Sequence, residues 1–276
     1  MTLIVTMLSY DFMRSAFAAG LVVSLVAACV GYFLVLRNLT FAGHALSHVG
    51  FAGATGAVLL GLSPLGGLLL ATLLGGVGMG LLGERLRGRD VAVGVILTLS
   101  LGLGTLFLHF YTQFATQANA LLFGNVLGVS PATLHSLLWL AAVCLAGLAL
   151  IARPLLFASL EPELAEARGV SLRLISVLFL MIVAIAVAES VQVVGILLVF
   201  ALMVGPAAAA GRLTGKLWWG LGLTVVLAML ETTLGIVLAY VTDWPTSFWI
   251  SALSAGVYLL SLGAGRLGAG RASPAS

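Results

Sequence analysis

The sequence predicts an all-α integral membrane protein with about nine transmembrane helices, and three observations predict this class. Hydrophobic residues make up 62% of the 276 residues and charged residues only 8%, whereas a soluble domain carries about 25% charged residues. The apolar residues fall into runs of bilayer length. Most of the 34 glycines lie inside those runs, where glycine lets neighbouring helices approach closely. A chain with so little polar surface needs the lipid bilayer as its solvent.

Each predicted span approaches or exceeds the roughly 17–20 helical residues that cross about 30 Å of hydrocarbon, except the last, which is short. The true number lies between eight and ten, because residues 115–130 are apolar enough for a short helix at one surface. No basic segment precedes the first run, so we expect a retained span rather than a cleaved signal peptide. The predicted spans are residues 15–36, 45–62, 65–82, 91–110, 134–152, 174–193, 195–211, 217–240 and 248–262.

The basic residues predict the orientation. With nine spans and an external N-terminus, all of the 12 Lys and Arg residues except Arg14 fall on one side. Basic residues mark cytoplasmic loops, so we expect the N-terminus outside and a short tail, residues 263–276, in the cytoplasm. Charges scattered over short loops are typical of topology determinants. They argue against nucleic acid as a partner, despite the net charge of +3.

Two kinds of chemistry are not indicated by the sequence. Cys29 and Cys144 lie deep in apolar runs, and we expect them to be small hydrophobic residues rather than a disulfide or a metal pair. The chain contains no Gly-x-x-x-x-Gly-Lys-Ser/Thr motif, which would cradle a nucleotide. If ATP drives this protein, another chain must hydrolyse it.

One polar segment, residues 159–173, reads SLEPELAEARGVSLR and predicts a short amphipathic helix on the cytoplasmic surface. Ser159 is a plausible N-cap, glutamates lie in the first turns, and Gly169 is placed as the C-terminal stop. Leu160 and Leu164 lie four residues apart and should share one face. The helix is either a solvated connection or a docking helix for a cytoplasmic partner.

Ionisable side chains inside predicted spans are the candidate functional residues, because each costs about 2.5–3.5 kcal/mol on insertion scales. His44 and His48 lie four residues apart at the start of the second span, and on a helix this spacing puts both imidazoles on one face, as in paired metal ligands. Alternatively, the two histidines form hydrogen bonds to neighbouring helices. His109 and His135, near external span ends, are expected at the membrane interface.

Two carboxylates also lie within spans. By residue count, Glu231 falls near the middle of the membrane and Glu189 towards the outer face. Each is either part of a transport path or a hydrogen-bonding anchor between helices. Imidazole together with carboxylate suits zinc, iron or manganese, and no thiolate-rich site indicates copper(I).

Three stretches carry a resemblance to a known family. Residues 32–48 read YFLVLRNLTFAGHALSH, residues 194–210 read VGILLVFALMVGPAAAA, and residues 234–246 include LGIVLAY followed by TDWPT. Together they resemble the zinc/manganese/iron permease family of ABC transporters. The resemblance extends from about residue 14 to 262, nearly the whole chain.

The resemblance implies a single transmembrane permease domain over residues 1–276, of the type II ABC importer kind shared with cobalamin and siderophore permeases. It implies a multi-pass protein of a bacterial inner membrane, with a second permease copy, cytoplasmic ATP-binding subunits and an extracytoplasmic metal-binding protein as partners. The chain itself is then no enzyme, holds no permanent cofactor and carries a divalent metal ion as substrate. The segment 159–173 matches the ATPase-coupling segment, with candidate residues Leu160, Glu161, Glu163, Leu164, Glu166, Arg168 and Gly169.

One departure from the family concerns His44. Much of the family has an aspartate there, in a pattern like Gly-Asp-Ala-x-Ser-His, whereas His48 matches the family's own histidine. A neutral nitrogen in place of an anionic oxygen favours zinc over manganese. We expect His44, His48 and Glu231 to converge on the ion, with Glu189 as a further candidate. The rival hypotheses are a gradient-driven secondary transporter with Glu189 and Glu231 as relay groups, and a permease for a metal chelate.

Overall fold

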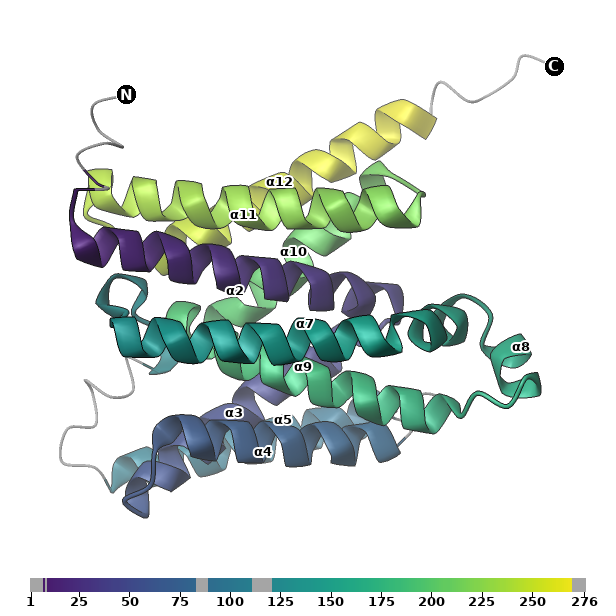
Figure 1. Cartoon of the computed structure of the whole chain (residues 1–276), viewed down its shortest axis with the longest axis horizontal. Helices are drawn as coiled ribbons and strands as arrows, with labels where there is room; N and C mark the ends of the chain where they lie inside the picture. The colour runs from purple at the N-terminus through teal and green to yellow at the C-terminus, as the bar shows by residue number, and fades with distance from the viewer. Residues whose placement is uncertain (1–6, 8, 83–88, 111–120, 270–276) are drawn as a thin grey trace.

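The computed structural model describes residues 7, 9–82, 89–110 and 121–269, and this part of the chain is built of helices (Figure 1). Eight of the helices are long and apolar enough to cross a membrane, and α3, with 20 residues, is a further long helix. The prediction of an all-α bundle with about nine spans is confirmed. The long helices are α2 (Asp11–Leu36), α3 (Thr40–Leu59), α4 (Pro64–Leu81), α5 (Arg89–His109), α7 (Pro131–Leu160), α9 (Leu172–Val194), α10 (Ile196–Leu213), α11 (Leu217–Thr242) and α12 (Thr246–Ala269).

The helix bounds differ from the predicted ones mainly at the bundle ends. The last span is not short, since α12 has 24 residues and continues to Ala269. A helix needs apolar residues only while it crosses the hydrocarbon, so the end of the apolar run does not mark the end of the helix. A short helix was expected within residues 115–130, and residues 115–120 of it lie outside the described part. The 3-10 turn η1 (Val126–Gly128) follows them.

The helices form two groups joined by a central pair (Figure 1). In one group α11 packs on α2 and α12, and α10 packs on α2 and α12. In the other group α3 packs on α4 and α5, while α4 packs on α9. The central helices are α2 and α9, with 61% and 72% of their spanning residues buried, against 22% for α5 and 17% for α12. Outer helices therefore present most of their surface to lipid.

Glycine permits a close helix crossing between α3 and α4. A Cβ atom on Gly53 would collide with the side chain of Ala71 and the carbonyl oxygen of Gly67, and a Cβ on Gly67 would collide with the carbonyl of Gly53. Van der Waals contact between small residues is what holds membrane helices together. The sequence pattern of glycines around the two histidines thus fixes α3 tightly against α4.

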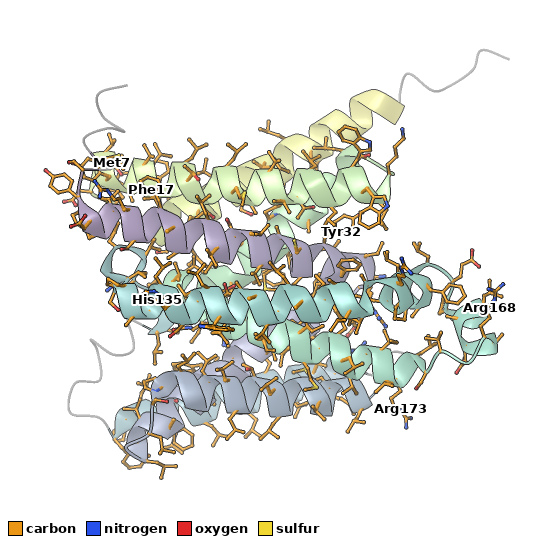
Figure 2. All side chains as sticks on the ribbon, viewed as in Figure 1. Met7, Phe17, Tyr32, His135, Arg168 and Arg173 are labelled. Carbon is orange, nitrogen blue, oxygen red and sulfur yellow. The ribbon has the colours of Figure 1, made fainter. Side chains whose placement is uncertain are left out.

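One end of the bundle carries α8 (Pro162–Ala167) and most of the basic side chains; we call it the α8 end (Figure 1). Arg168 and Arg173 lie at this end in Figure 2, whereas His135 lies at the opposite end. The first residue of α5, Arg89, and the N-cap of α11, Lys216, also lie there because their helices begin at this end. The predicted grouping of basic residues on one side is thus reproduced by the helix directions. The predicted positions 85, 87 and 271 lie outside the described residues.

The structure corrects the predicted bounds of the polar helix. Ser159 is not an N-cap, because α7 continues through Leu160 and the Ser159 hydroxyl donates to the carbonyl of Leu155 at 2.5 Å. Back-bonding of this kind keeps serine inside a helix. The helix α8 begins instead at Pro162, whose fixed φ suits the first helical position. Leu160 and Leu164 consequently belong to different helices and do not share one helical face.

Candidate functional site

A tight turn between α2 and α3 positions the two histidines. Asn38 adopts a left-handed conformation, with φ of 55°, which asparagine tolerates better than most residues. The N–H of Leu39 donates back to the carbonyl of Leu34 at 2.9 Å, so the chain reverses within three residues. Helix α3 then starts at Thr40 and places His44 and His48 in its second and third turns.

The structure confirms that the two imidazoles lie together. Their ring centroids are 4.9 Å apart with the planes at 88°, and the ring of Phe200 on α10 lies 5.0 Å from that of His44. His44 is half-buried and His48 is 7% exposed. Neither Nδ1 atom has a hydrogen-bond partner in the described part of the chain. A buried nitrogen without a partner costs free energy, so two such nitrogens in neighbouring rings indicate partners outside the described part of the chain.

The expected convergence of His44, His48 and Glu231 in one chain is not found. Within residues 9–82, 89–110 and 121–269, no three His, Cys, Asp or Glu side chains lie close enough to hold one metal ion. Helix α11, which carries Glu231, packs on α2, α10 and α12, whereas α3 packs mainly on α4 and α5 and also on α9 and α10. Helix α10 packs on both α3 and α11 without bringing the carboxylate together with the two histidines. Residue spacing within single helices gave no information on this.

Glu189 lies on the central helix α9 and is fully buried. Neither carboxylate oxygen has a hydrogen-bond partner in the described part of the chain, and the same holds for the hydroxyl of Ser190 and the amide nitrogen of Gln192. A lone carboxylate in low dielectric is costly when ionised. The C-terminal third of α9 therefore holds a group of polar atoms whose partners are not seen within the chain's described residues.

Glu231 lies near the middle of α11, about 21 Å along the helix from Leu217 at 1.5 Å per residue. It is 2% exposed, as its predicted mid-membrane position would suggest. The hydroxyl of Ser254 on α12 faces it, but this hydroxyl donates to the carbonyl of Ala201 at 3.0 Å. Neither oxygen of Glu231 has a hydrogen-bond partner among the described residues.

The other singled-out residues occupy simpler positions. His135 is exposed, and its Nδ1 lies 2.7 Å from the carbonyl oxygen of Pro131 in its own helix. His109 is exposed at the end of α5, beside the ring of Phe110. Both positions fit the expected membrane interface. Cys29 and Cys144 are free thiols, and the thiol of Cys144 donates to the carbonyl of Ile182 at 3.6 Å.

The predicted coupling residues lie on an exposed projection at the α8 end (Figure 1). Leu160 is 61% exposed and Leu164 43% exposed, while Ala165 is fully buried and anchors the helix. Gly169 has φ of 85° and ends α8 as predicted, and the N–H of Val170 donates to the carbonyl of Ala165 at 3.0 Å. The side chains of Glu161, Glu163, Glu166 and Arg168 are exposed around the two leucines.

Sequence reasoning missed Phe200, whose ring contacts that of His44 with the centroids 5.0 Å apart. The contact joins two helices far apart in the chain, so helical spacing could not reveal it. The only available signal was that Phe200 lies inside one of the three stretches that carry the family resemblance.

Three features together define a polytopic membrane transport protein. The central helices are enclosed, the outer helices face lipid, and polar groups inside the spans have no partner among the described residues. The chain belongs to the ABC 3 transport family, whose model matches residues 9–264. It is 27% identical over 256 residues to the manganese transport system membrane protein MntC of Halalkalibacterium halodurans, covering 92% of this chain and 88% of that protein. It is 31% identical over 270 residues to a probable metal transport system membrane protein of Treponema pallidum, covering 96% and 100%.

A solved structure has the same fold. A chain of PsaBC from Streptococcus pneumoniae, in complex with an Fab, aligns with a TM-score of 0.84 and 25% identity over 94% of both chains. The helix order described above is therefore that of an ABC transporter permease.

Proposed function

We propose that the chain is the permease subunit of an ATP-driven importer that moves a divalent metal ion, with zinc preferred, into the cytoplasm. The observation that carries this proposal is the His44–His48 pair, with its two unpartnered Nδ1 atoms, inside a permease fold. Similarity to proteins named for manganese and metal transport supports a metal as substrate. Two nitrogen ligands suit zinc better than manganese.

Two histidines alone do not complete a transition-metal site, since zinc takes four ligands. We propose that a second copy of the chain adjoins α3 and that the ion passes between the two copies. Glu231 and Glu189, which lie apart from the histidines, are proposed as separate carboxylates of the pathway. The outer face of α5, which packs beside α3, supports the proposal of a second copy.

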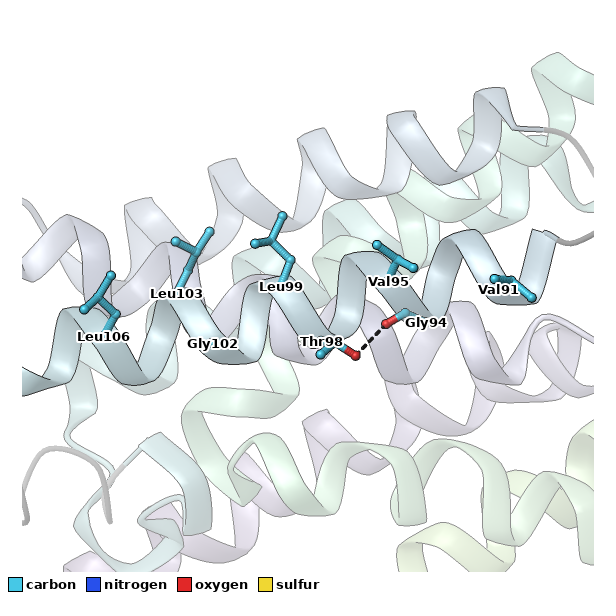
Figure 3. Close-up of a pocket in the computed structure, with 8 residues that line it drawn as sticks. All are labelled: Val91, Gly94, Val95, Thr98, Leu99, Gly102, Leu103 and Leu106. Carbon is cyan, nitrogen blue, oxygen red and sulfur yellow. Dashed lines mark hydrogen bonds between the residues drawn. The ribbon is translucent and has the colours of Figure 1, made fainter.

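The outer face of α5 forms an apolar groove of about 710 Å³ (Figure 3). Gly94, Thr98 and Gly102 recur every four residues along its floor, and the Thr98 hydroxyl donates to the carbonyl of Gly94 at 2.9 Å. Such small residues let a neighbouring helix approach. Among the described residues, a Cβ on Gly94 would meet only the ring of Phe41 at 3.7 Å. Phe41 precedes His44 by three residues and shares its face of α3, so this part of α5 lies near the histidine pair.

The remaining partners follow from the two ends of the bundle. We propose that α8 docks on a cytoplasmic ATP-binding subunit, because Leu160 and Leu164 are exposed at the end that carries the basic residues. Because basic residues mark the cytoplasmic side, we propose that the N-terminus lies outside and the C-terminus inside a bacterial inner membrane. An extracytoplasmic metal-binding protein then delivers the ion at the end opposite α8. ATP hydrolysis takes place on the separate subunit.

The deciding experiment measures uptake of zinc, manganese and iron by cells that lack the chain and carry either the wild-type protein or a variant. His44→Ala should reduce uptake at least tenfold, whereas His135→Ala, a histidine at the opposite end, should not. His44→Asp should shift the preference from zinc towards manganese. Equal uptake in His44→Ala and wild type would remove the histidine pair from the path. The variants Glu231→Gln and Glu189→Gln test the two carboxylates in the same assay.

Coupling to ATP is tested separately. Leu164→Asp should abolish co-purification of the ATP-binding subunit, and Leu62→Asp, an exposed leucine at the opposite end, should leave it intact. Uptake that persists in ATP-free vesicles carrying an ion gradient would instead establish a secondary transporter.

A further inference from the structure

A second groove lies at the α8 end of α11, on the opposite group of helices from the histidines. It has a volume of about 610 Å³. Its polar lining residues come first in the sequence and its apolar ones follow. Its lining residues are Thr214, Lys216, Trp219, Gly222, Leu223 and Val226. The polar side chains lie in the α10–α11 connection and the others on one face of α11. The groove is therefore polar at the bundle end and apolar deeper in the membrane.

The apolar half is an open helix face. Trp219 is 72% exposed and Val226 is 52% exposed, and a Cβ on Gly222 between them would meet no atom within 4 Å. From Trp219 to Val226 this face runs about 10 Å along α11. Gly222 leaves a hollow in the middle of the strip that packing within the described part of the chain does not fill. An alkyl chain fits a hollow of this shape and polarity.

The polar half carries positive charge without acidic partners. Lys216 is exposed, and Arg212 lies in the last turn of α10. The Arg212 guanidinium is 5.4 Å from the ring centroid of Tyr258 and donates to the Tyr258 hydroxyl at 3.3 Å. Neither cation forms an ion pair with a described residue. Tyr258 thus holds Arg212 beside the connection, where its charge adds to that of Lys216.

The start of α11 strengthens this positive region. The helix has 26 residues and no side-chain N-cap, so the amides of its first turn lack the acceptor that usually satisfies them. The Thr214 hydroxyl instead accepts from the N–H of Lys216 at 3.2 Å. A helix N-terminus favours an anion, and here it coincides with the lysine at the mouth of the groove.

We propose that this groove binds one anionic phospholipid of the cytoplasmic leaflet. Its phosphate lies at Lys216 and the first turn of α11, and an acyl chain lies along Trp219, Gly222 and Val226. Trp218 and Trp219, 71% and 72% exposed, mark the headgroup level, where tryptophan is enriched. A phospholipid satisfies both halves of the groove at once, because it joins an anion to an alkyl chain. The site requires no metal and is independent of the proposed transport.

The test measures lipid binding to the purified full-length chain in detergent by native mass spectrometry. Phosphatidylglycerol and phosphatidylcholine with identical acyl chains are compared. We expect preferential retention of phosphatidylglycerol, and about fivefold weaker binding in Lys216→Gln, as expected for one basic residue near an anionic surface. Arg153→Gln, which removes an exposed charge from α7 at the same end, should bind as wild type does.

The apolar half has its own variant. Gly222→Leu should fill the hollow and weaken binding of phosphatidylglycerol, while Gly78→Leu, also at a glycine with open space around it, should not. Unchanged melting temperatures of both variants show that the fold is intact. Equal retention of the two lipids, or unchanged binding in Lys216→Gln, would overturn the proposal. So would displacement of the lipid by millimolar inorganic phosphate in Gly222→Leu and wild type alike, which would show a simple anion site.

Discussion

The α3–α4 crossing and the outer face of α5 are both lined with glycine, but the chain uses the glycines differently. At the crossing, Gly53 and Gly67 face each other, and neither position has room for a Cβ atom. On α5, a Cβ on Gly102 would meet no atom within 4 Å. Packing within the described part of the chain therefore explains Gly53 and Gly67 but not Gly102. For the open glycine on α5, which lies in an apolar groove, we propose contact with a second copy of the chain.

The largest expected effect is at the crossing. Gly53→Ala should destabilise the protein by about 3 kcal/mol, the upper end of the usual cost of overpacking, because backbone atoms cannot move aside as a side chain can. Thermal unfolding of the purified chain in detergent measures this. A melting temperature equal to that of wild type would show that α3 and α4 are less closely packed than described.

The next largest effect concerns the α5 groove. Gly102→Leu should leave the melting temperature of the chain unchanged but weaken association of two copies at least tenfold, or about 1.4 kcal/mol. Crosslinking in the membrane or mass measurement in detergent reports the association. If Gly102→Leu associates as wild type does, the second copy contacts another face.

The smallest effect is expected at Gly78 on α4, which faces open space and has no proposed partner. Gly78→Ala should stabilise the chain slightly, by up to about 1 kcal/mol, because alanine has the higher helix propensity. Chemical denaturation alongside Gly53→Ala gives the comparison. Destabilisation here would mean that open glycines cannot be identified from the space around them.

Much of the fold could be predicted from the sequence, because bilayer thickness fixes the length of an apolar helix. The predicted start of α11 at Leu217 agrees to the residue, and the predicted C-terminal ends of α2 and α4 agree to within one residue. The prediction for Ser159 was wrong, because two local preferences compete there. Capping by serine favoured an earlier helix start, and Pro162 determined the actual one.

The candidate site could be predicted only where it depends on one helix. His44 and His48 are neighbours because four residues make about one helical turn. The contact of His44 with Phe200 and the separation of Glu231 from the histidines depend on how distant helices pack. No periodicity within a single span contains that information. The role of the two carboxylates therefore stays a prediction.

The low hydropathy of α3 has a consequence for assembly. This helix carries two histidines and four glycines and is not among the eight helices that are apolar enough to cross a membrane by composition. It packs instead against α4, α5, α9 and α10. A span that gains little from lipid depends on its protein neighbours to stay inserted. We expect α3 to enter the membrane together with α2 and α4 during synthesis, so the helix that carries His44 and His48 is stably inserted only once its neighbours are.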